Sequence, residues 1–281
     1  VDIKLLKRIS NEIESKGVNQ FLRKGISDRG SHFKLVYFQP KSGLNPEHLN
    51  LYNKNRFIEV RQVHYSKQNE YLSIDMGIFI NGIPIMMLEL KNSLTGQNHN
   101  HAVKQCKEDR DPREPLFKFK RIMAYFAVGN EKVYMTTRLK GLKTRFLPFN
   151  KGIDNPVNPN GHMTHYLWND ILQKNSVLDL VENFVTIRDD VEKFYDSKQN
   201  KLVDKKSQTL IFPRFHQLQV INNLRKDVLK KGTGENYLIQ HTTGSGKSLS
   251  IGWLSHMLAS LYQNRDDSNR IFDSVIVVTD R

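Results

Sequence analysis

The sequence predicts an α/β protein made of two parts. Residues 57–91 hold short runs rich in β-branched and apolar residues with two-residue alternation, and residues 100–109 then have the polar, helix-favouring composition of a surface helix. Near the C-terminus, an apolar run, a glycine-rich turn and a helical segment follow one another between residues 237 and 261. At 281 residues the chain is long enough for two domains, each with its own core.

The first part, residues 1–150, is expected to be a mixed central sheet flanked by helices. Apolar residues recur at three-to-four spacing between residues 3 and 13, which predicts an amphipathic packing helix. A turn at Asn81-Gly82 is expected to join two of the strands within residues 57–91. Two further strands, at residues 121–129 and 132–137, are expected to extend the same sheet.

Residues 151–207 are expected to connect this domain to a second one. Residues 148–161 hold three prolines, two glycines and four asparagines, which predicts a loop. Apolar residues between 167 and 184 predict helices, and residues 196–207 form a charged, apolar-poor segment that we interpret as a linker. The second domain is therefore expected to occupy residues 208–281.

The charge of the chain indicates a polyanionic partner. Lysine and arginine number 43 against 29 acidic residues, a formal charge of +14, which favours nucleic acid over a merely solubilising surface. Cys106 is the only cysteine, which excludes an internal disulfide and a cysteine zinc site and agrees with a reducing cytosol. No apolar run approaches the roughly twenty residues that span a bilayer, so we expect a cytoplasmic protein without a membrane partner.

Residues 240–248 form the most informative segment, because a glycine turn there lies between an apolar run and a helical segment. The two glycines let backbone N–H groups approach a triphosphate, the lysine can reach the β and γ phosphates, and the serine hydroxyl after it can bind Mg²⁺. A chance glycine turn is the alternative. The residues expected to bind ATP in this phosphate-binding loop are Thr243, Gly244, Ser245, Gly246, Lys247 and Ser248, with Ser248 as the Mg²⁺ ligand.

This loop is similar to the form found in helicase-like motors, since His241 replaces the first glycine of the usual pattern. Upstream, residues 212–217 are followed by a helical pattern and resemble the Q motif of superfamily 2 helicases. The resemblance implies that Gln217 selects ATP by contacting the adenine edge; a turn that caps a helix is the alternative. Residues 275–281 resemble the next motor strand and the start of a single-strand contact motif.

Two acids and a lysine lie on neighbouring predicted strands. Glu89 and Lys91 share one strand face because side chains alternate, and Asp75 lies on the preceding strand. Two carboxylates that converge with a lysine would hold Mg²⁺ and orient a water for attack on phosphorus. The pattern resembles the PD-(D/E)xK nuclease motif, which implies that Asp75 and Glu89 are metal ligands and that Lys91 positions the nucleophilic water. A solvated strand face is the alternative.

Strand register offers a test of this interpretation. A strict two-residue turn at Asn81-Gly82 would place Asp75 and Glu89 on opposite faces of the sheet, because a slip of one residue reverses the face. One extra residue must be absorbed near Gly77 or Pro84. We therefore predict an irregularity in the strand pairing between the two acids.

The helix after the lysine strand carries Gln105. Nucleases associated with DNA motors have Gln-x-x-x-Tyr here, which implies that Gln105 contacts the substrate backbone or the site; Asp109 stands in the tyrosine position. A solvent-facing polar residue is the alternative. Positive charge expected to form a phosphate-binding rim around it comes from Lys104, Lys107, Arg110, Arg113, Lys118, Lys120 and Arg121.

Taken in order, these features resemble the restriction (R) subunit of type I restriction-modification enzymes, a PD-(D/E)xK nuclease domain followed by a truncated RecA-like motor domain. The resemblance implies ATP-driven translocation of double-stranded DNA and Mg²⁺-dependent, non-specific cleavage away from a recognition site. It also implies separate modification (methyltransferase) and specificity subunits as partners.

Two other functions fit these motifs: an ATP-dependent helicase or remodeller with a degenerate nuclease-like DNA-binding domain, and a noncatalytic module that docks on a methyltransferase. Because the chain ends before any acidic motor motif or second motor lobe, we expect it to bind nucleotide weakly and not to hydrolyse it.

Overall fold

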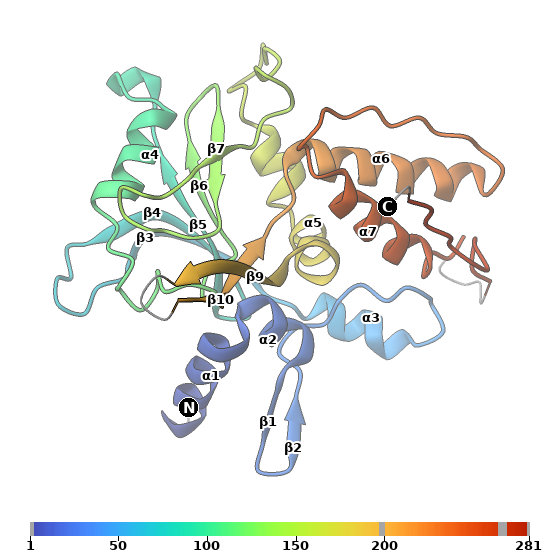
Figure 1. The fold of residues 1–281 in the computed structure, drawn as a ribbon, viewed down its shortest axis with the longest axis horizontal. Coiled ribbons are helices and arrows are strands. Elements are labelled where there is room, and N and C mark those ends of the chain that lie inside the picture. Colours follow the sequence, from blue (N-terminus) through green and yellow to red (C-terminus); the bar gives the residue numbers. More distant parts are fainter. Residues whose placement is uncertain (1–2, 197–199, 264–268, 280–281) are drawn as a thin grey trace.

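The computed structural model describes residues 3–196, 200–263 and 269–279. Its centre is a six-stranded mixed sheet of order β3-β4-β5-β6-β7-β8 (Figure 1). The strands are β3 (Phe57–His64), β4 (Ser73–Ile80), β5 (Ile83–Leu90), β6 (Ala124–Val128), β7 (Val133–Thr136) and β8 (Leu147–Pro148). The predicted mixed sheet and the predicted strands within residues 57–91, 121–129 and 132–137 are confirmed.

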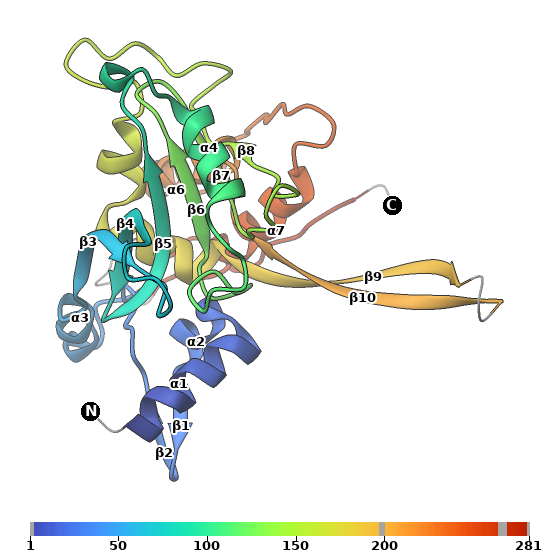
Figure 2. The ribbon, with the colours of Figure 1, turned by 90° about the vertical axis from the view of Figure 1, so that its left-hand side faces the viewer.

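Neighbouring strands of the sheet are antiparallel except for β5 and β6, which are parallel. A parallel pair needs a crossover connection, and here it contains a short 3₁₀ turn, η1 (Ser93–Thr95), and the helix α4 (His99–Glu108). The predicted helix at residues 100–109 is thereby confirmed. Helix α4 lies on one face of the sheet (Figure 2), where Cys106 joins a buried cluster with Met87 and Tyr125.

The opposite face of the sheet packs on a larger apolar core. The N-terminal helices α1 (Ile3–Lys16) and α2 (Val18–Lys24) contribute to it, and the predicted helix at residues 3–13 is confirmed. A small hairpin of β1 (Ile26–Asp28) and β2 (Ser31–Phe33) and the helix α3 (Pro46–Asn53) precede the sheet. Short helical turns after the sheet complete the core: η2 (Leu167–Ile171), α5 (Lys174–Asp179) and η3 (Leu180–Phe184).

The predicted loop at residues 148–161 is confirmed apart from the last residue of β8, but the predicted linker at residues 196–207 is wrong where the structure describes it. Strands β9 (Thr186–Asp196) and β10 (Lys201–Ile211) form a long antiparallel hairpin that projects from the molecule (Figure 2). The ribbon has no buried face over most of its length, so the apolar alternation that predicts a strand is missing. Opposite charges face each other across it, as Lys193 does Asp204. Residues 197–199 lie outside the described residues.

The C-terminal part contains α6 (Phe215–Lys231) and α7 (Lys247–Leu258). The apolar run at residues 237–239 and the segment that resembles the next motor strand, described up to residue 279, form no strand within the described residues, and Leu238 and Val278 are 93% and 88% exposed. A strand needs a hydrogen-bonded neighbour, and no described strand lies beside these segments. Asp280 and Arg281, the end of the expected motor strand, lie outside the described residues. None of the described helices is long and apolar enough to cross a membrane.

Candidate functional site

The pairing of β4 and β5 contains the predicted irregularity. Phe79 faces Pro84, but the next pair is Ile78 with Met86, so Ile85 is an extra residue on β5. This β-bulge lies directly beside the proline that the sequence suggested. Beyond the bulge, the register brings the two predicted acidic residues level with each other on the same face of the sheet.

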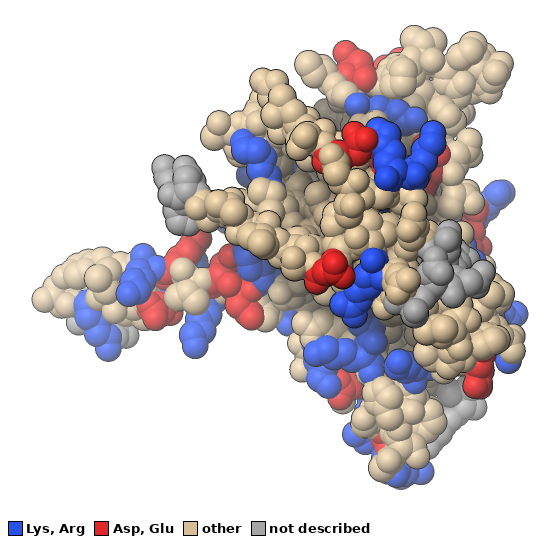
Figure 3. Space-filling view, turned by 90° about the vertical axis from the view of Figure 1, so that its right-hand side faces the viewer, with Lys and Arg blue, Asp and Glu red and all other residues tan. Residues whose placement is uncertain are grey.

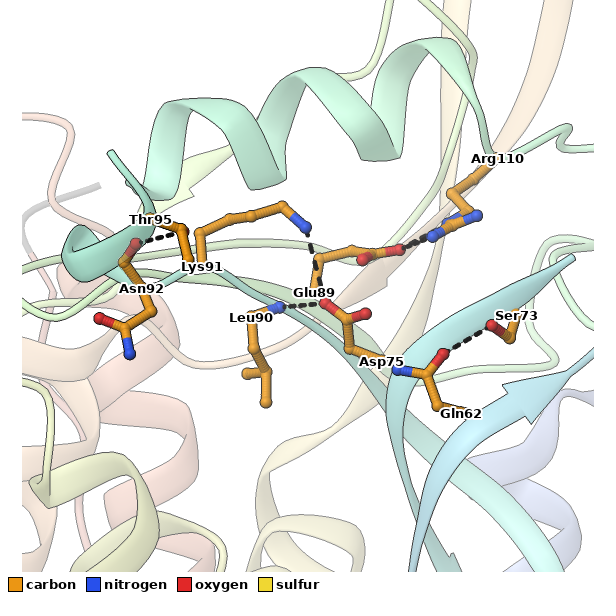
Figure 4. A network of polar contacts seen from close by, with 9 residues as sticks. All are labelled: Gln62, Ser73, Asp75, Glu89, Leu90, Lys91, Asn92, Thr95 and Arg110. Atoms are coloured by element: carbon orange, nitrogen blue, oxygen red, sulfur yellow. Dashed lines mark hydrogen bonds and ion pairs between the residues drawn. The ribbon is translucent and has the colours of Figure 1, made fainter. Parts of the chain in front are cut away.

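Asp75, Glu89 and Lys91 are brought together as the sequence predicts (Figure 4). Asp75 Oδ2 accepts a hydrogen bond of 2.8 Å from the backbone N–H of Leu90, and the Lys91 ammonium lies 3.7 Å from the same oxygen. The side chains of Lys91 and Asp75 are 14% and 24% exposed, so solvent or a ligand can reach them. Figure 4 shows the Lys91 ammonium and the Asp75 carboxylate directed toward each other beside Glu89, whose carboxylate is directed toward Arg110.

Glu89 is fully buried and is paired with an arginine that the sequence analysis had placed elsewhere. Its Oε1 accepts a hydrogen bond of 2.5 Å from Nε of Arg110, which follows α4, and forms an ion pair of 2.5 Å with Nη2 of the same side chain. The Nη1 of Arg110 donates to the Tyr65 hydroxyl at 3.1 Å. Glu89 Oε2 is buried and has no hydrogen-bond partner in the described part of the chain.

The environment of Glu89 favours its neutral form. Burial raises the pKa of Glu89 from 4.5 to about 8; Arg110 opposes the rise, and repulsion from the nearby Asp75 adds to it. The charge of Asp75 is therefore felt by Glu89. A divalent cation between them would remove the repulsion that disfavours two neighbouring carboxylates.

The donor set fits Mg²⁺. Asp75 and Glu89 offer two carboxylates, and residues 3–196, 200–263 and 269–279 hold no group of three or more His, Cys, Asp or Glu residues that could bind a metal. Mg²⁺ is commonly held by one or two carboxylates and keeps several waters for the remaining positions. Oε2 of Glu89 is also buried without a hydrogen-bond donor, and a bound cation would supply the missing contact.

Gln105 lies on α4, half-buried, next to Cys106, whose thiol pKa is raised by burial. No hydrogen bond of its side chain to Asp75, Glu89 or Lys91 occurs among the described residues, so its contact with the site stays a prediction.

The predicted phosphate-binding rim is wrong in part. Arg110 is buried against Glu89 and does not lie on the surface. Lys118 is 3.0 Å from Glu14, and Lys120 donates to the carbonyl of Ser15, so these cations attach α1 to the sheet. Arg121 makes similar contacts with α1, to Ser10 and Glu14. A count of basic residues cannot separate cations that face solvent from those used inside the fold.

Sequence reasoning missed an exposed basic turn after β7. Thr144 is buried and fixes this turn: its hydroxyl accepts from Lys140 N–H at 2.8 Å and donates to the Gly141 carbonyl at 2.6 Å. Gly141, with φ of 58°, lies against the end of α4. The signal was present in the sequence, since residues 132–153 contain six basic residues and no acidic one. The exposed cations of this basic turn are Arg138, Lys140, Lys143 and Arg145.

The glycine-rich loop has the backbone form that a phosphate-binding loop needs. Gly244 and Gly246 have φ of 75° and 88°, which side chains rarely adopt, and α7 begins at Lys247. The Lys247 ammonium donates to the carbonyls of His241 and Thr242 at 3.2 and 3.3 Å. Thr243 and Ser248 are exposed, and Ser245 is buried beneath the loop.

Gln217 contacts this loop directly. Its Nε2 donates to the Gly246 carbonyl at 2.9 Å, and its Oε1 accepts from the Arg214 N–H at 2.9 Å. The neighbouring His216 ring lies 3.1 Å from the carbonyl of Ser245. Both ends of the Gln217 amide are thus used within the protein, and its contact with adenine stays a prediction.

Residues 8–144 match the family model described as Type I restriction enzyme R protein N terminus. This segment of the chain is similar to that family. The matched segment contains Asp75, Glu89, Lys91 and Gln105.

Two proteins of Methanocaldococcus jannaschii are similar over a longer range. The chain is 24% identical, over 94% of its length, to a protein named as the endonuclease subunit of the type I restriction enzyme MjaVIIIP. It is 22% identical, over 75% of its length, to one named as the endonuclease subunit of MjaVIIP. The chain spans 24% and 19% of the lengths of these two relatives.

Proposed function

We propose that the chain is part of the R subunit of a type I restriction-modification enzyme and carries its PD-(D/E)xK nuclease site. The observation that supports this best is the convergence of Asp75, Glu89 and Lys91, which the bulge at Ile85 makes possible. The reaction proposed is Mg²⁺-dependent, non-specific double-strand cleavage of DNA. ATP-driven translocation, supported by the loop at residues 240–248, would bring distant DNA to the nuclease.

Each residue of the site has a separate role in this proposal. Asp75 and Glu89 would hold the cation, and a bound Mg²⁺ supplies Lewis-acid polarisation of the phosphate and a more acidic water. The Leu90 N–H fixes Asp75 through one carboxylate oxygen. The Lys91 ammonium, 3.7 Å from that oxygen, is placed to orient the attacking water and to stabilise negative charge that develops on phosphate.

The DNA would be held by phosphate contacts and not by base contacts. The basic turn defined above presents Lys140, Lys143 and Arg145 on a rigid backbone next to the end of α4. On the face seen in Figure 3, by contrast, Lys and Arg are interspersed with Asp and Glu, and the projecting hairpin carries both signs. The basic turn has exposed cations and no acidic residue, so it is the element proposed to bind the DNA phosphates.

ATP would bind with its phosphates against Gly244, Gly246 and Lys247, and Ser248 would contribute a Mg²⁺ ligand. The Lys247 ammonium donates to two loop carbonyls in the structure, and on ATP binding it would donate to phosphate oxygens in their place. Modification and specificity subunits would supply recognition of the DNA sequence.

The deciding experiment uses the full-length subunit with its modification and specificity partners, duplex DNA, ATP and Mg²⁺. Glu89→Ala should abolish DNA cleavage and retain DNA-stimulated ATP hydrolysis, whereas Lys247→Ala should abolish both. Unchanged cleavage by Glu89→Ala rejects the nuclease assignment.

One observation also suits the second candidate, a helicase or remodeller with a noncatalytic nuclease-like domain: Glu89 is buried and engaged by Arg110. That candidate predicts ATP hydrolysis without cleavage by the unaltered protein, so the same experiment separates the two.

A further inference from the structure

We propose that Arg110 and Tyr65 are positioning residues that fix which oxygen of Glu89 faces the divalent cation. The inference rests on the proposed function, because it assigns a role toward the same metal site. Neither residue would touch the cation or the DNA. Both would act through the orientation of the Glu89 carboxylate.

The contact between Arg110 and Glu89 is made through a single oxygen. Arginine often pairs with a carboxylate through two parallel hydrogen bonds, one to each oxygen. Here Nε and Nη2 of Arg110 both converge on Oε1, at 2.5 Å each, and Oε2 is left buried without a partner among the described residues. A buried carboxylate oxygen without a donor is costly, so an occupant for that position would be stabilising.

Asp75 is held in a corresponding way. Its Oδ2 accepts from the Leu90 N–H and faces the Lys91 ammonium. The two acids, level with each other across β4 and β5, are thus each restrained through one oxygen (Figure 4). This arrangement leaves one oxygen of each acid without these contacts, and those two oxygens would be the ones to hold a shared cation.

Tyr65 restrains the arginine in turn. Its hydroxyl accepts from Nη1 at 3.1 Å, and the guanidinium carbon lies 5.5 Å from the centre of its ring. The ring is itself fixed against Phe117, with ring centres 4.5 Å apart. Tyr65 directly follows β3, Arg110 lies two residues after the end of α4 and Glu89 is on β5, so the orientation of Glu89 depends on the packing of three separate elements.

The test measures Mn²⁺ affinity of the full-length subunit without nucleotide, by calorimetry and by Mn²⁺ electron paramagnetic resonance. Arg110→Lys keeps the charge but removes the fork of donors, and we expect its Mn²⁺ affinity to fall by about 10- to 100-fold. Tyr65→Phe keeps the ring and removes only the hydroxyl, and a smaller loss of about 3- to 10-fold is expected. Arg225→Lys, at an ion pair with Asp179 on another part of the fold, is the matched control and should bind Mn²⁺ normally.

The outcomes distinguish this inference from the proposed function. If Asp75→Asn and Glu89→Gln bind Mn²⁺ as the unaltered protein does, the metal site itself is wrong. If those two variants lose Mn²⁺ but Arg110→Lys and Tyr65→Phe do not, only the positioning role falls. Tighter binding in Arg110→Lys would show that the arginine competes with the cation, which also overturns the inference. Should Arg110→Lys fail to fold, Tyr65→Phe decides the matter alone.

Discussion

Replacing Glu89 by glutamine is expected to remove a one-proton dependence of stability on pH. The pKa of Glu89 rises from 4.5 in the unfolded chain to about 8 in the fold, chiefly because the side chain is buried. Between these values the folded state binds a proton that the unfolded state has lost. The stabilisation is therefore complete below pH 4.5 and is lost as pH rises through about 8.

The size of the effect follows from proton linkage. A difference of one bound proton lowers the free energy of unfolding by about 1.4 kcal/mol for each pH unit, or about 3 kcal/mol across two units within that window. Urea denaturation followed by circular dichroism, with a chelator present, measures this slope. Glu89→Gln should lack the contribution, and Glu108→Gln, an exposed change on α4, should keep it.

Two results would refute this reasoning. Equal slopes for the unaltered protein and Glu89→Gln would mean that Glu89 does not gain a proton on folding. A slope contribution of the opposite sign, with stability rising with pH because of Glu89, would mean that Arg110 outweighs burial and keeps the carboxyl charged. Since Mg²⁺ must displace the bound proton, the stabilisation by saturating Mg²⁺ should also be larger near pH 8 than near pH 6.

Three further predictions concern the bulge, the basic turn and the packing of α7. Deletion of Ile85 should restore regular pairing, separate Asp75 from Glu89 and abolish cleavage while DNA-stimulated ATP hydrolysis persists; retained cleavage in a folded deletion variant would contradict the register argument. Changing Lys140, Lys143 and Arg145 to Gln should reduce the slope of log affinity for duplex DNA against log salt by about 2 to 3, whereas the same charge change at Lys201, Lys205 and Lys206 on β10 should have little effect. An equal reduction in both triple variants would show that net charge alone matters. Trp253→Ala should destabilise the protein by about 3–5 kcal/mol in thermal or urea unfolding, because the ring packs on Phe184 and its Nε1 donates to the Phe184 carbonyl at 2.9 Å; a loss below about 1 kcal/mol would show that α7 is loosely attached.

The parts of the fold that could be predicted from the sequence are those with a buried face. Helix α4 buries one side, and strands β4 and β5 lie inside the sheet and are buried largely on both faces, so the spacing and run length of their apolar residues predict their structure. The hairpin of β9 and β10 lacks a regular spacing of apolar residues, because both of its faces are exposed to solvent over most of its length. The segment at residues 237–239 has the reverse problem: it is apolar enough for a strand, but a strand also needs a neighbour to pair with.

The candidate site also has one part that local sequence rules predict and one part that they do not. The need for an extra residue between Asp75 and Glu89 follows from parity, since side chains alternate and a two-residue turn fixes the register. No local rule identifies Arg110 as the partner of Glu89, because the two residues are 21 positions apart and come together only through the packing of α4 on the sheet.

Burial of Glu89 nevertheless makes such a partner necessary in retrospect. A carboxylate with no exposed surface, next to a second carboxylate, is stable only if it is neutralised by a proton, a cation or an arginine. Arg110 binds Oε1 of Glu89 and leaves Oε2 without a hydrogen-bond partner among the described residues. The described residues therefore compensate only one of the two buried carboxylate oxygens. In the proposed function, the Glu89 oxygen that Arg110 leaves unsatisfied would bind the metal, and stability and activity would then depend on the same oxygen atom.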